Sequence, residues 1–317
     1  MKFILIWVAI FGVILFLLPL GINMSNTSHP SVDSKSSHVE YINVYFADDN
    51  KVVTMKKEEY ILGVLMAEMP ASFELEALKA QAVAARTYTE EKLISNGSSS
   101  SHPGADICTD YTHCQAYISE ENAKKGWGKN ASLYFEKCKK AVDETCGIVA
   151  VYNQTPIKAV FHAYASGNTE NASEVWGGNV EYLKSVESPG DMSAPEFESR
   201  VEVPVNEFIT ALSNEGNIDF SGGIVIGNVT YTQGGSVNEI EICNQKFKGT
   251  KLREIFGLKS ACFSISVGDQ SIVFNVKGYG HGVGLSQYGA NYFAKQGLTY
   301  EEILKKYYTG ITLSKPD

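Results

Sequence analysis

Residues 58–88 read EEYILGVLMAEMPASFELEALKAQAVAARTY, and this stretch predicts two consecutive helices. The first helix must end near Met69, because Pro70 disfavours helical geometry in the residue before it. The second helix is predicted over residues 75–94, where leucine and alanine recur at helical spacing before an Asn-Gly pair that stops a helix. Glu68 is therefore expected at the C-terminal end of the first helix.

The sequence on both sides of these helices predicts an α+β fold. Hydrophobic residues alternate over residues 42–46, and β-branched residues are frequent in 149–164 and 223–231, so all three segments are expected to contain strands. Residues 300–308 predict an amphipathic helix. We expect one domain over residues 42–317, with a core of mixed sheet and helices.

An N-terminal transmembrane helix is expected to precede this domain. Residues 3–22 read FILIWVAIFGVILFLLPLGI, an uncharged run long enough to cross a hydrocarbon core of about 30 Å, which predicts an anchor over residues 1–22. A cleaved signal peptide would have a shorter apolar run and a small-residue cleavage site, and the residues that follow supply none. The nearby positive charges, on the amino terminus and Lys2, precede the span and predict an extracytoplasmic domain. Residues 23–41 are rich in Ser, Asn, Thr and Pro and predict a flexible tether.

The composition limits the class of ligand. Of the 317 residues, 44% are hydrophobic and 20% are charged, which is typical of a folded protein. The net charge of −9 and the pI near 5.3 argue against a nucleic-acid partner, because binding to phosphates needs a basic surface. A neutral polymer is a better match to this charge.

A cluster of cysteine and histidine lies in residues 97–139, which we interpret as a smaller insertion with its own stabilising device. Within the stretch HPGADICTDYTHC, the side chains of His102, Cys108, His113 and Cys114 form a complete tetrahedral ligand set for zinc, and such a closed shell is structural. The alternative is a disulfide between Cys108 and Cys114 in an oxidising compartment. The spacing alone leaves both interpretations open.

The remaining four cysteines have no pattern of a thiol nucleophile, since none lies beside a histidine in the sequence. They are expected either to form disulfides, for which three pairings exist, or to stay buried as apolar residues. These residues are Cys138, Cys146, Cys243 and Cys262.

Three stretches combine glycine with polar and aromatic residues, as binding sites often do. They are the helix end at AEMP, the segments FHAYASGNTE and VWGGNVEYLKSVESPGD, and the run GYGHGVGLSQYGA. Glycine lets a ligand approach the backbone, and the faces of Trp and Tyr stack on sugar rings. A saccharide ligand is therefore expected.

These stretches resemble the family of stage II sporulation protein D, which is related to amidase-enhancer domains. The resemblance rests on ILGVLMAEMP, EALKAQAVAARTY, FHAYASGNTE, YLKSVESPGD and GYGHGVGLSQYGA, in that order, and covers most of the chain after the tether. It implies a lytic transglycosylase that acts on peptidoglycan during engulfment of the forespore, from the mother-cell membrane. It also implies partner proteins, including an amidase or endopeptidase that strips the stem peptides from the glycan strands.

The resemblance identifies Glu68, in the EMP motif, as the catalytic acid. One carboxyl group can first protonate the glycosidic oxygen and then accept the proton of the C6 hydroxyl as the 1,6-anhydro ring closes. Partial burial among Leu65, Met66 and Met69 is expected to raise the pKa of this carboxyl. The alternative is an ordinary surface glutamate at a helix end.

The resemblance also implies substrate-binding residues. Arg86 is expected near the acid, with a surface pair to Glu90 as the alternative. His281 is expected to contact substrate or, alternatively, to orient a glycine-rich loop. The other residues expected in the groove, which would otherwise be solvated surface residues, are Ser166, Asn168, Tyr182, Lys184, Asp191, Ser286, Gln287 and Tyr288.

Two features of the resemblance concern local structure. Some clostridial members are similar in the Cys/His cluster and use two histidines and two cysteines, so the resemblance favours zinc over the disulfide. The family more often has two consecutive glycines in the stretch that reads SGNTE here. Asn168 tolerates a positive φ better than most residues, so we expect the turn to be kept.

Three functions remain in competition at this stage. A lytic transglycosylase needs Glu68 in a groove, whereas a non-catalytic glycan-binding module that stimulates an amidase needs only the groove. A zinc hydrolase needs three ligands and an exposed water, and the four available ligands argue against it.

Overall fold

The computed structural model describes residues 41–95 and 102–315. The expected anchor, residues 1–22, lies outside the described residues, as does the expected tether except for Tyr41. Within the described ranges, no helix is both long enough and apolar enough to cross a membrane.

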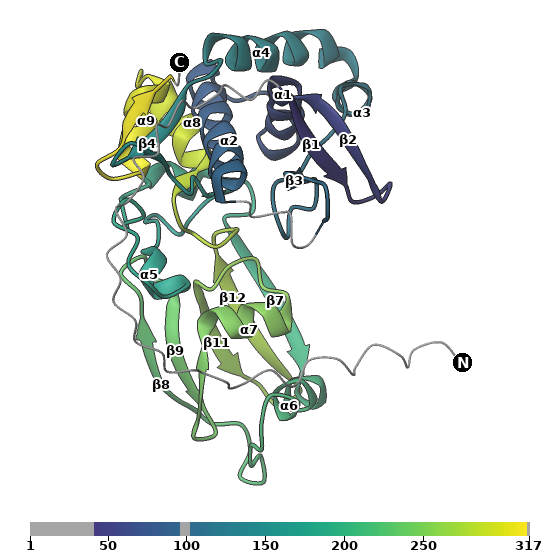
Figure 1. Cartoon of the computed structure of the whole chain (residues 1–317). Helices are drawn as coiled ribbons and strands as arrows, with labels where there is room; N and C mark the ends of the chain where they lie inside the picture. The colour runs from purple at the N-terminus through teal and green to yellow at the C-terminus, as the bar shows by residue number, and fades with distance from the viewer. Residues whose placement is uncertain (1–40, 96–101, 316–317) are drawn as a thin grey trace, which may run out of the picture. The chain divides into compact units, whose positions relative to one another are not determined.

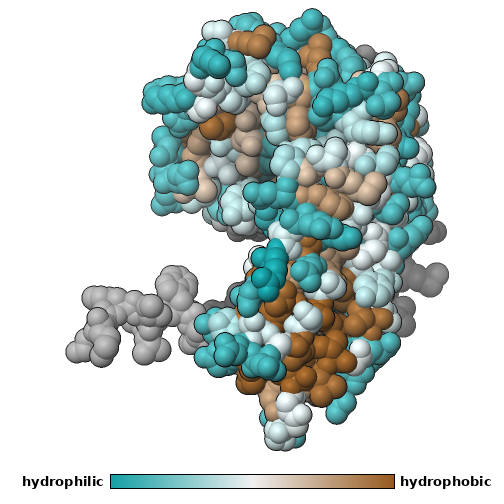
Figure 2. All heavy atoms as spheres, turned by 180° about the vertical axis from the view of Figure 1, so that it is seen from behind, coloured by the Kyte–Doolittle hydropathy of each residue, from teal (hydrophilic) through white to brown (hydrophobic). Residues whose placement is uncertain are grey.

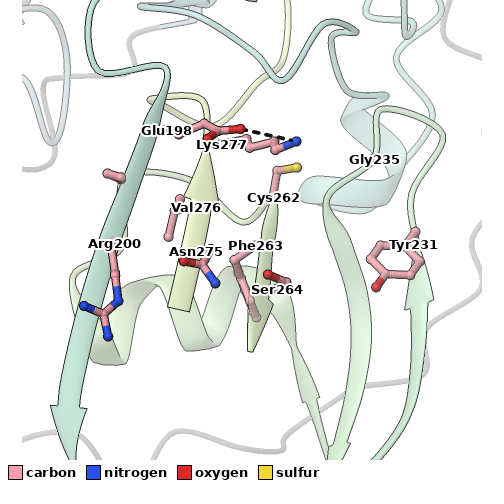
Figure 3. A pocket seen from close by; sticks show the side chains of 11 residues that line it. Glu198, Arg200, Tyr231, Gly235, Cys262, Phe263, Ser264, Asn275, Val276 and Lys277 are labelled. Carbon is pink, nitrogen blue, oxygen red and sulfur yellow. Dashed lines mark ion pairs between the residues drawn. The ribbon is translucent and has the colours of Figure 1, made fainter. Parts of the chain in front are cut away.

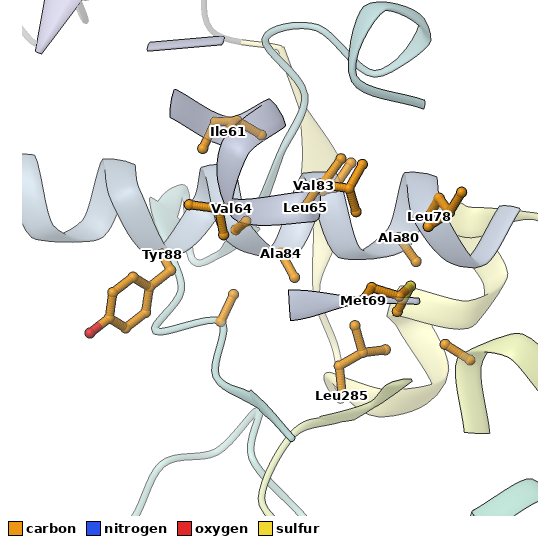
Figure 4. Packing of buried hydrophobic residues seen from close by; sticks show 14 of the residues in the cluster. Ile61, Val64, Leu65, Met69, Leu78, Ala80, Val83, Ala84, Tyr88 and Leu285 are labelled. Atoms are coloured by element: carbon orange, nitrogen blue, oxygen red, sulfur yellow. The ribbon is translucent and has the colours of Figure 1, made fainter. Parts of the chain in front are cut away.

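Helix α2 (Leu75–Ser95) lies at the centre of the first hydrophobic core. It contacts α1 (Lys57–Glu68), α4 (Ala131–Glu144), α8 (Gln287–Lys295) and α9 (Tyr300–Tyr307) (Figure 1). Its alanines are completely buried, and Figure 4 shows the side chains of α1 packed against α2 around Val83 and Ala84. A helix with neighbours on most sides must be apolar on most sides, and small side chains allow the neighbours to approach closely. The predicted bounds of α1, α2 and α9 are confirmed within one residue.

Short strands surround this helical core. Strands β1 (Tyr41–Phe46) and β2 (Lys51–Lys56) form an antiparallel pair, and β3 (Ile107–Cys108) runs parallel to β1 with Cys108 opposite Tyr45. The predicted strand segment 149–164 contains three short strands, β4 (Val149–Tyr152), β5 (Thr155–Pro156) and β6 (Phe161–His162). Strand β4 also pairs with β14 (Thr312–Ser314).

The parallel pairing of β6 with β13 (Leu285–Ser286) joins two of the glycine-containing stretches. Leu285 lies opposite Phe161, and Ser286 lies opposite His162. Beyond these two strands, isolated β-bridges join Tyr164 to Tyr279 and Glu170 to Val283. The stretches FHAYASGNTE and GYGHGVGLSQYGA, which are more than a hundred residues apart in the sequence, therefore lie side by side.

A second hydrophobic core is built by the strand-rich residues 198–277. One sheet holds β7 (Glu198–Pro204), β12 (Ser271–Lys277) and β11 (Phe263–Val267), and another holds β8 (Ile226–Tyr231), β9 (Val237–Ile242) and β10 (Gln245–Lys248). Helices α6 (Val205–Ser213) and α7 (Gly249–Phe256) complete this core, in which Phe208 stacks on Phe256 and Phe274 contacts both rings at a tilt. In Figure 2, hydrophobic residues gather on the face of this strand-rich part. Only β8 had been predicted, as residues 223–231.

The expected insertion, residues 97–139, contributes β3, α3 (Glu120–Trp127), a 3-10 turn η1 (Gly128–Asn130) and the first part of α4. Cys138 of α4 is completely buried in the same core as α2. The end of this segment therefore shares the main core, and its first part forms the loop that carries the Cys/His cluster. The remaining short elements are α5 (Ala172–Val175) and η2 (Pro189–Ser193).

Candidate functional site

Glu68 is the last residue of α1, as the position of Pro70 predicts. Met69 has an extended backbone, its N–H donates to the carbonyl of Leu65, and its side chain is buried, which fixes the direction of the chain at the helix end. The Glu68 side chain is half-buried, and the backbone N–H of Ala116 donates to its Oε1 at 2.7 Å. Burial raises the pKa of Glu68 above its ordinary value, and the hydrogen bond from Ala116 partly opposes this effect.

The loop that supplies Ala116 is attached directly to α1. The N–H of Ile118 donates to the carbonyl of Gly63 at 3.2 Å, and the ring of Tyr117 covers Gly63. A Cβ atom at position 63 would lie 2.1 Å from that ring, so glycine is required here by close packing. Gln115 is buried and donates to the hydroxyl of Thr89 on α2 at 3.3 Å. Residues 115–118 thus hold Ala116 against the end of α1.

The Cys/His cluster ends at Cys114, which directly precedes the loop of residues 115–118. The ligand atoms of His102, Cys108 and His113 all lie within 4.8 Å of one another. The Nδ1 atom of His113 lies 3.3 Å from the sulfur of Cys108 and 3.4 Å from the sulfur of Cys114. In a tetrahedral zinc site the sulfur and nitrogen ligands are about 3.5 Å apart, so these separations and donor types match zinc. Cys108 has a free thiol, so no disulfide joins it to Cys114. Free thiols are also found at Cys138, Cys146, Cys243 and Cys262.

Arg86 is fully buried, contrary to the expectation that it contacts sugar oxygens. Its guanidinium donates to both carboxylate oxygens of Glu58, at 2.8 and 2.7 Å, and to the carbonyl of Ile148 at 3.2 Å. The alternative, a surface pair with Glu90, is also wrong, because Glu90 pairs with Lys57. The ion pair with Glu58 compensates for the burial of the Arg86 charge and joins α1 to α2.

Asp191 and Ser286 were expected to line the groove, and the structure buries both completely. The carboxylate of Asp191 accepts hydrogen bonds from the N–H of Ala165 at 2.8 Å and from the hydroxyl of Ser286 at 2.5 Å. Burial raises the pKa of Asp191 to about 7. Gln287 is also buried, and its Nε2 lies 3.5 Å from Oε1 of Gln81 on α2. These three side chains connect the glycine-containing stretches to one another and to α2; Asp191 and Ser286 expose no surface to a ligand, and Gln287 exposes 5%.

The remaining expected groove residues lie closer to solvent. The hydroxyl of Tyr182 accepts a hydrogen bond from the N–H of Lys158 at 3.0 Å, and Lys184 donates to Asn179 at 2.9 Å. The ring of Tyr288 contacts Phe73 edge-on at 4.9 Å. All three expected residues, Tyr182, Lys184 and Tyr288, are half-buried, so part of each side chain is available to a ligand.

Ser166, Asn168 and His281 line one small cavity together with the buried carboxylate of Glu170. The hydroxyl of Ser166 donates to the carbonyl of Gly234 at 3.1 Å, and Asn168 is exposed. Gly167 has a φ of +107°, whereas Asn168 is not among the residues with positive φ. The turn in SGNTE is kept, but the glycine and not the asparagine provides the unusual backbone geometry.

His281 has the properties of a structural histidine. Its Nδ1 accepts a hydrogen bond from the N–H of Val283 at 3.0 Å within the glycine-rich run. Burial and the nearby charge of Arg253 lower the pKa of His281 to about 4, so the ring is neutral at pH 7. This arrangement matches the expected alternative, in which the imidazole orients the loop.

Two larger cavities are lined wholly or partly by the strand-rich residues 198–277. One, of about 540 Å³, is lined mainly by residues of β7, β11 and β12, and Figure 3 shows its ion pair between Glu198 and Lys277. Arg200, which also lines it, pairs with Glu202. The other, of about 470 Å³, is lined by Trp176, Arg253 and His281, among others.

Three residues of these cavities, Glu170, Trp176 and Arg253, were not singled out from the sequence. Glu170 and Trp176 lie in stretches that had been selected for their composition, so the signal was present at the level of the stretch. Arg253 lies outside every selected stretch.

Comparison with known proteins places this geometry in a family context. Residues 46–152 match the family model described as Stage II sporulation protein. The chain is 38% identical to Stage II sporulation protein D of Bacillus subtilis, over 87% of the chain and 79% of that protein. The corresponding protein of Bacillus amyloliquefaciens is also 38% identical, over 86% of the chain and 78% of the relative. An Amidase enhancer of Bacillus subtilis is 30% identical over 80% of the chain and 40% of its own length.

Proposed function

The chain belongs to the stage II sporulation protein D family of sporulation proteins, and we propose that it is a lytic transglycosylase that cleaves the glycan strands of peptidoglycan. The observation that carries this proposal is the environment of Glu68. The carboxyl group is half-buried at a helix end, burial raises its pKa, and a backbone N–H is directed at one of its oxygens. A raised pKa favours the protonated form that can give up a proton, and the directed N–H favours the carboxylate that can then act as a base.

Glu68 performs both proton transfers in the proposed reaction. The protonated carboxyl donates its proton to the oxygen that joins C1 of N-acetylmuramic acid to the next N-acetylglucosamine, and the bond between C1 and this oxygen breaks. The Glu68 carboxylate, stabilised by the N–H of Ala116, then accepts the proton of the C6 hydroxyl as O6 bonds to C1. The proton count of Glu68 is restored, and the product is a 1,6-anhydro sugar formed without water. The second carboxylate that hydrolytic glycosidases use is not required.

We propose that His102, Cys108, His113 and Cys114 hold a structural zinc ion. The ligand atoms of His102, Cys108 and His113 lie within 4.8 Å of one another, and the sulfur of Cys114 lies 3.4 Å from Nδ1 of His113, which supports this proposal. Two thiolates with two imidazoles would leave no position for a reacting water. Bound zinc would order residues 102–114 and supply no reaction step. Because Ala116 follows the last ligand by two residues, an ordered cluster helps to keep its N–H directed at Glu68.

The proposed setting follows from the family and from the N-terminal sequence. We propose that residues 1–22 anchor the chain in the mother-cell membrane, with the domain on the extracytoplasmic side, during engulfment. The proposed substrate is a glycan strand without stem peptides, which an amidase or endopeptidase acting alongside this protein would supply. The sporulation names of the relatives support this setting.

The second candidate function is a glycan-binding protein that enhances an amidase without cleaving the strand. The similarity to an Amidase enhancer supports this alternative. The two candidates differ in what they require of Glu68, because only the enzyme needs the proton of this carboxyl group.

Mass spectrometry of peptide-stripped glycan strands distinguishes the candidates. The strands are incubated with the purified chain and, in parallel, with the Glu68→Gln variant. Anhydro-ended fragments from the wild type alone are the expected result. Reducing-end products would identify a hydrolase, and intact strands that are demonstrably bound to the protein would support the enhancer function.

A further inference from the structure

The cavity of about 470 Å³ combines a cationic group with an exposed aromatic ring. Trp176 follows α5 and Arg253 lies on α7, while His281 comes from the glycine-rich run GYGHGVGLSQYGA. His281 also lines the small cavity that holds Ser166 and Asn168, so the two cavities adjoin. The larger cavity therefore extends a site whose residues had been selected from the sequence for saccharide binding.

Within the part of the chain that the structure describes, Arg253 differs from the other two arginines in having no acidic partner. Arg86 pairs with Glu58 and Arg200 pairs with Glu202, whereas Arg253 forms no ion pair among the described residues. Its side chain is half-buried, and the hydrogen bond of its Nε atom goes to the carbonyl of Leu258 at 3.3 Å. Burial lowers the pKa of this guanidinium, which means that its charge is poorly solvated. An anion in the cavity would compensate for that loss of solvation.

The other charged groups around the cavity leave this role open. Glu174 also lies at the wall and keeps its negative charge, but its carboxylate accepts hydrogen bonds from the side-chain amide of Asn171 at 2.6 Å and from the N–H of Gln233 at 3.1 Å and forms no ion pair with Arg253. Lys248 donates to the side-chain carbonyl of Asn238 at 3.1 Å. The contact with Leu258 uses the single Nε hydrogen of Arg253, so the guanidinium keeps its NH2 donors for a carboxylate.

Trp176 supplies a surface suited to a sugar ring. Its side chain is 49% exposed, although tryptophan is usually well covered, and its ring lies 5.0 Å from the ring of His281, centroid to centroid. Gly177 and Gly178 follow it with φ values of +76° and +73°, and this turn presents the indole at the cavity. An aromatic face beside a cationic fork favours a ligand that has both a sugar ring and a carboxylate.

We propose that this cavity binds an N-acetylmuramic acid residue whose lactyl carboxylate is free, with Arg253 pairing with the carboxylate and Trp176 covering the sugar. The inference rests on the proposed glycan substrate and specifies how stripped strands are recognised. In an intact strand the lactyl group is in amide linkage to the stem peptide and carries no charge at this position. Arg253 is then left without an anion, and the bulk of the peptide enters the cavity.

Binding of two matched tetrasaccharides tests this assignment. Both alternate N-acetylglucosamine and N-acetylmuramic acid, and they differ only in the lactyl group, which is a free acid in one and a methylamide in the other. Titration calorimetry with the full chain carrying Glu68→Gln, which prevents cleavage, is expected to show at least a tenfold preference for the acid. Adding Arg253→Gln is expected to remove the preference by weakening binding of the acid, with the affinity for the amide unchanged.

The control variant is Arg200→Gln, which removes the same charge from an exposed arginine and is expected to keep the preference. Arg253→Lys keeps the charge without the bidentate geometry and is expected to retain part of the preference. Thermal melting of each variant verifies that the domain is folded.

The proposal would be overturned if the Glu68→Gln protein, with Arg253 present, bound the free-acid and methylamide tetrasaccharides with equal affinity. A preference for the acid that survives Arg253→Gln would also overturn it. This outcome is independent of cleavage. If the wild type releases no anhydro fragments but binds the acid through Arg253, the subsite stands and the enzymatic function fails. If cleavage occurs and the two ligands bind alike, the enzymatic function stands and the subsite fails.

Discussion

The backbone N–H of Ala116 donates a 2.7 Å hydrogen bond to the carboxylate of Glu68 across 48 residues of sequence. This bond favours the ionised carboxylate, while burial favours the protonated acid. A group that donates a proton and later removes one benefits from both influences. The bond also makes the geometry of Glu68 depend on the loop that carries the Cys/His cluster.

Glu68→Gln is expected to reduce release of anhydro fragments by about 10²–10⁴-fold, because the amide has no proton to transfer. The amide oxygen still accepts the N–H of Ala116, so the variant is expected to stay folded and to bind glycan strands. The matched control is Glu59→Gln, an exposed residue of the same helix. Wild-type rates in the Glu68→Gln variant, measured by mass spectrometry of the products, would contradict the role.

Gly63→Ala is expected to destabilise the domain by about 1–3 kcal/mol, because the new Cβ atom would lie 2.1 Å from the Tyr117 ring. Displacement of Tyr117 also shifts Ala116, so the cleavage rate is expected to fall as well. Gly126→Ala in α3 is the control, because nothing lies within 4 Å of its Cβ position, and it is expected to be neutral or slightly stabilising. The free energy of unfolding of the two variants is measured with denaturant, and equal values for Gly63→Ala and the wild type would contradict the close packing of Tyr117 on Gly63.

The stability of the domain is expected to depend on Asp191 between about pH 4 and pH 7. The pKa of this buried carboxyl is raised to about 7, so the folded state holds a proton that the unfolded state releases near its ordinary pKa of about 4. The contribution of Asp191 therefore stabilises the fold at low pH and declines as the pH rises to 7.

Urea unfolding of wild type and Asp191→Asn at pH 4.5 and pH 7.5 measures this effect. The amide that replaces the carboxyl group does not titrate, so the deficit of the variant relative to the wild type is expected to be larger at pH 4.5. Other groups that titrate in this range contribute to the free energy of unfolding of both proteins, so their contributions cancel in the difference between wild type and variant. A deficit that is larger at pH 7.5 would show that Asp191 is ionised in the folded state.

Arg86→Met is expected to destabilise the domain by about 3–5 kcal/mol, because it leaves the carboxylate of Glu58 beside the core without its partner. A role in substrate binding would instead raise the KM of a domain with unchanged stability. Thermal melting together with the KM of the surviving folded fraction separates these outcomes. Arg200→Gln, at an exposed pair, is expected to change neither quantity.

Removal of metal is expected to lower the melting temperature and to increase hydrogen exchange in residues 102–118. The purified chain is expected to contain about one zinc ion, and Cys108→Ser to contain none, because the ligand set would be incomplete. Cys146→Ser replaces an exposed cysteine outside the cluster and should keep the metal. Unchanged melting after complete chelation would rule out a structural role for the cluster.

Local signals in the sequence were sufficient for the elements that depend on them. Pro70 ends α1 after Glu68, and the Asn-Gly pair at residues 96 and 97 follows the end of α2 directly. The Cys/His side chains lie within thirteen residues of sequence, which allowed a common ligand set to be predicted. Pairing of β3 with β1 and stacking of His102 on Tyr45 position them. The family was also identified correctly from short motifs.

Tertiary structure decided which polar side chains face a ligand and which are buried. Arg86, Asp191 and Ser286 have the composition of surface residues, but they are completely buried with partners 28, 26 and 95 residues away. The strands of residues 198–277 were mostly missed, although β8, β9 and β10, and likewise β11 and β12, pair with their neighbours in the sequence. Only the pairing of β7 with β12 joins distant segments, which no local pattern records. The sequence by itself determined the helix ends and the place of Glu68 at one of them, because these follow from neighbouring residues. Burial and the lack of an acidic partner for Arg253 among the described residues follow from contacts between distant segments, and only the folded chain brings those segments together.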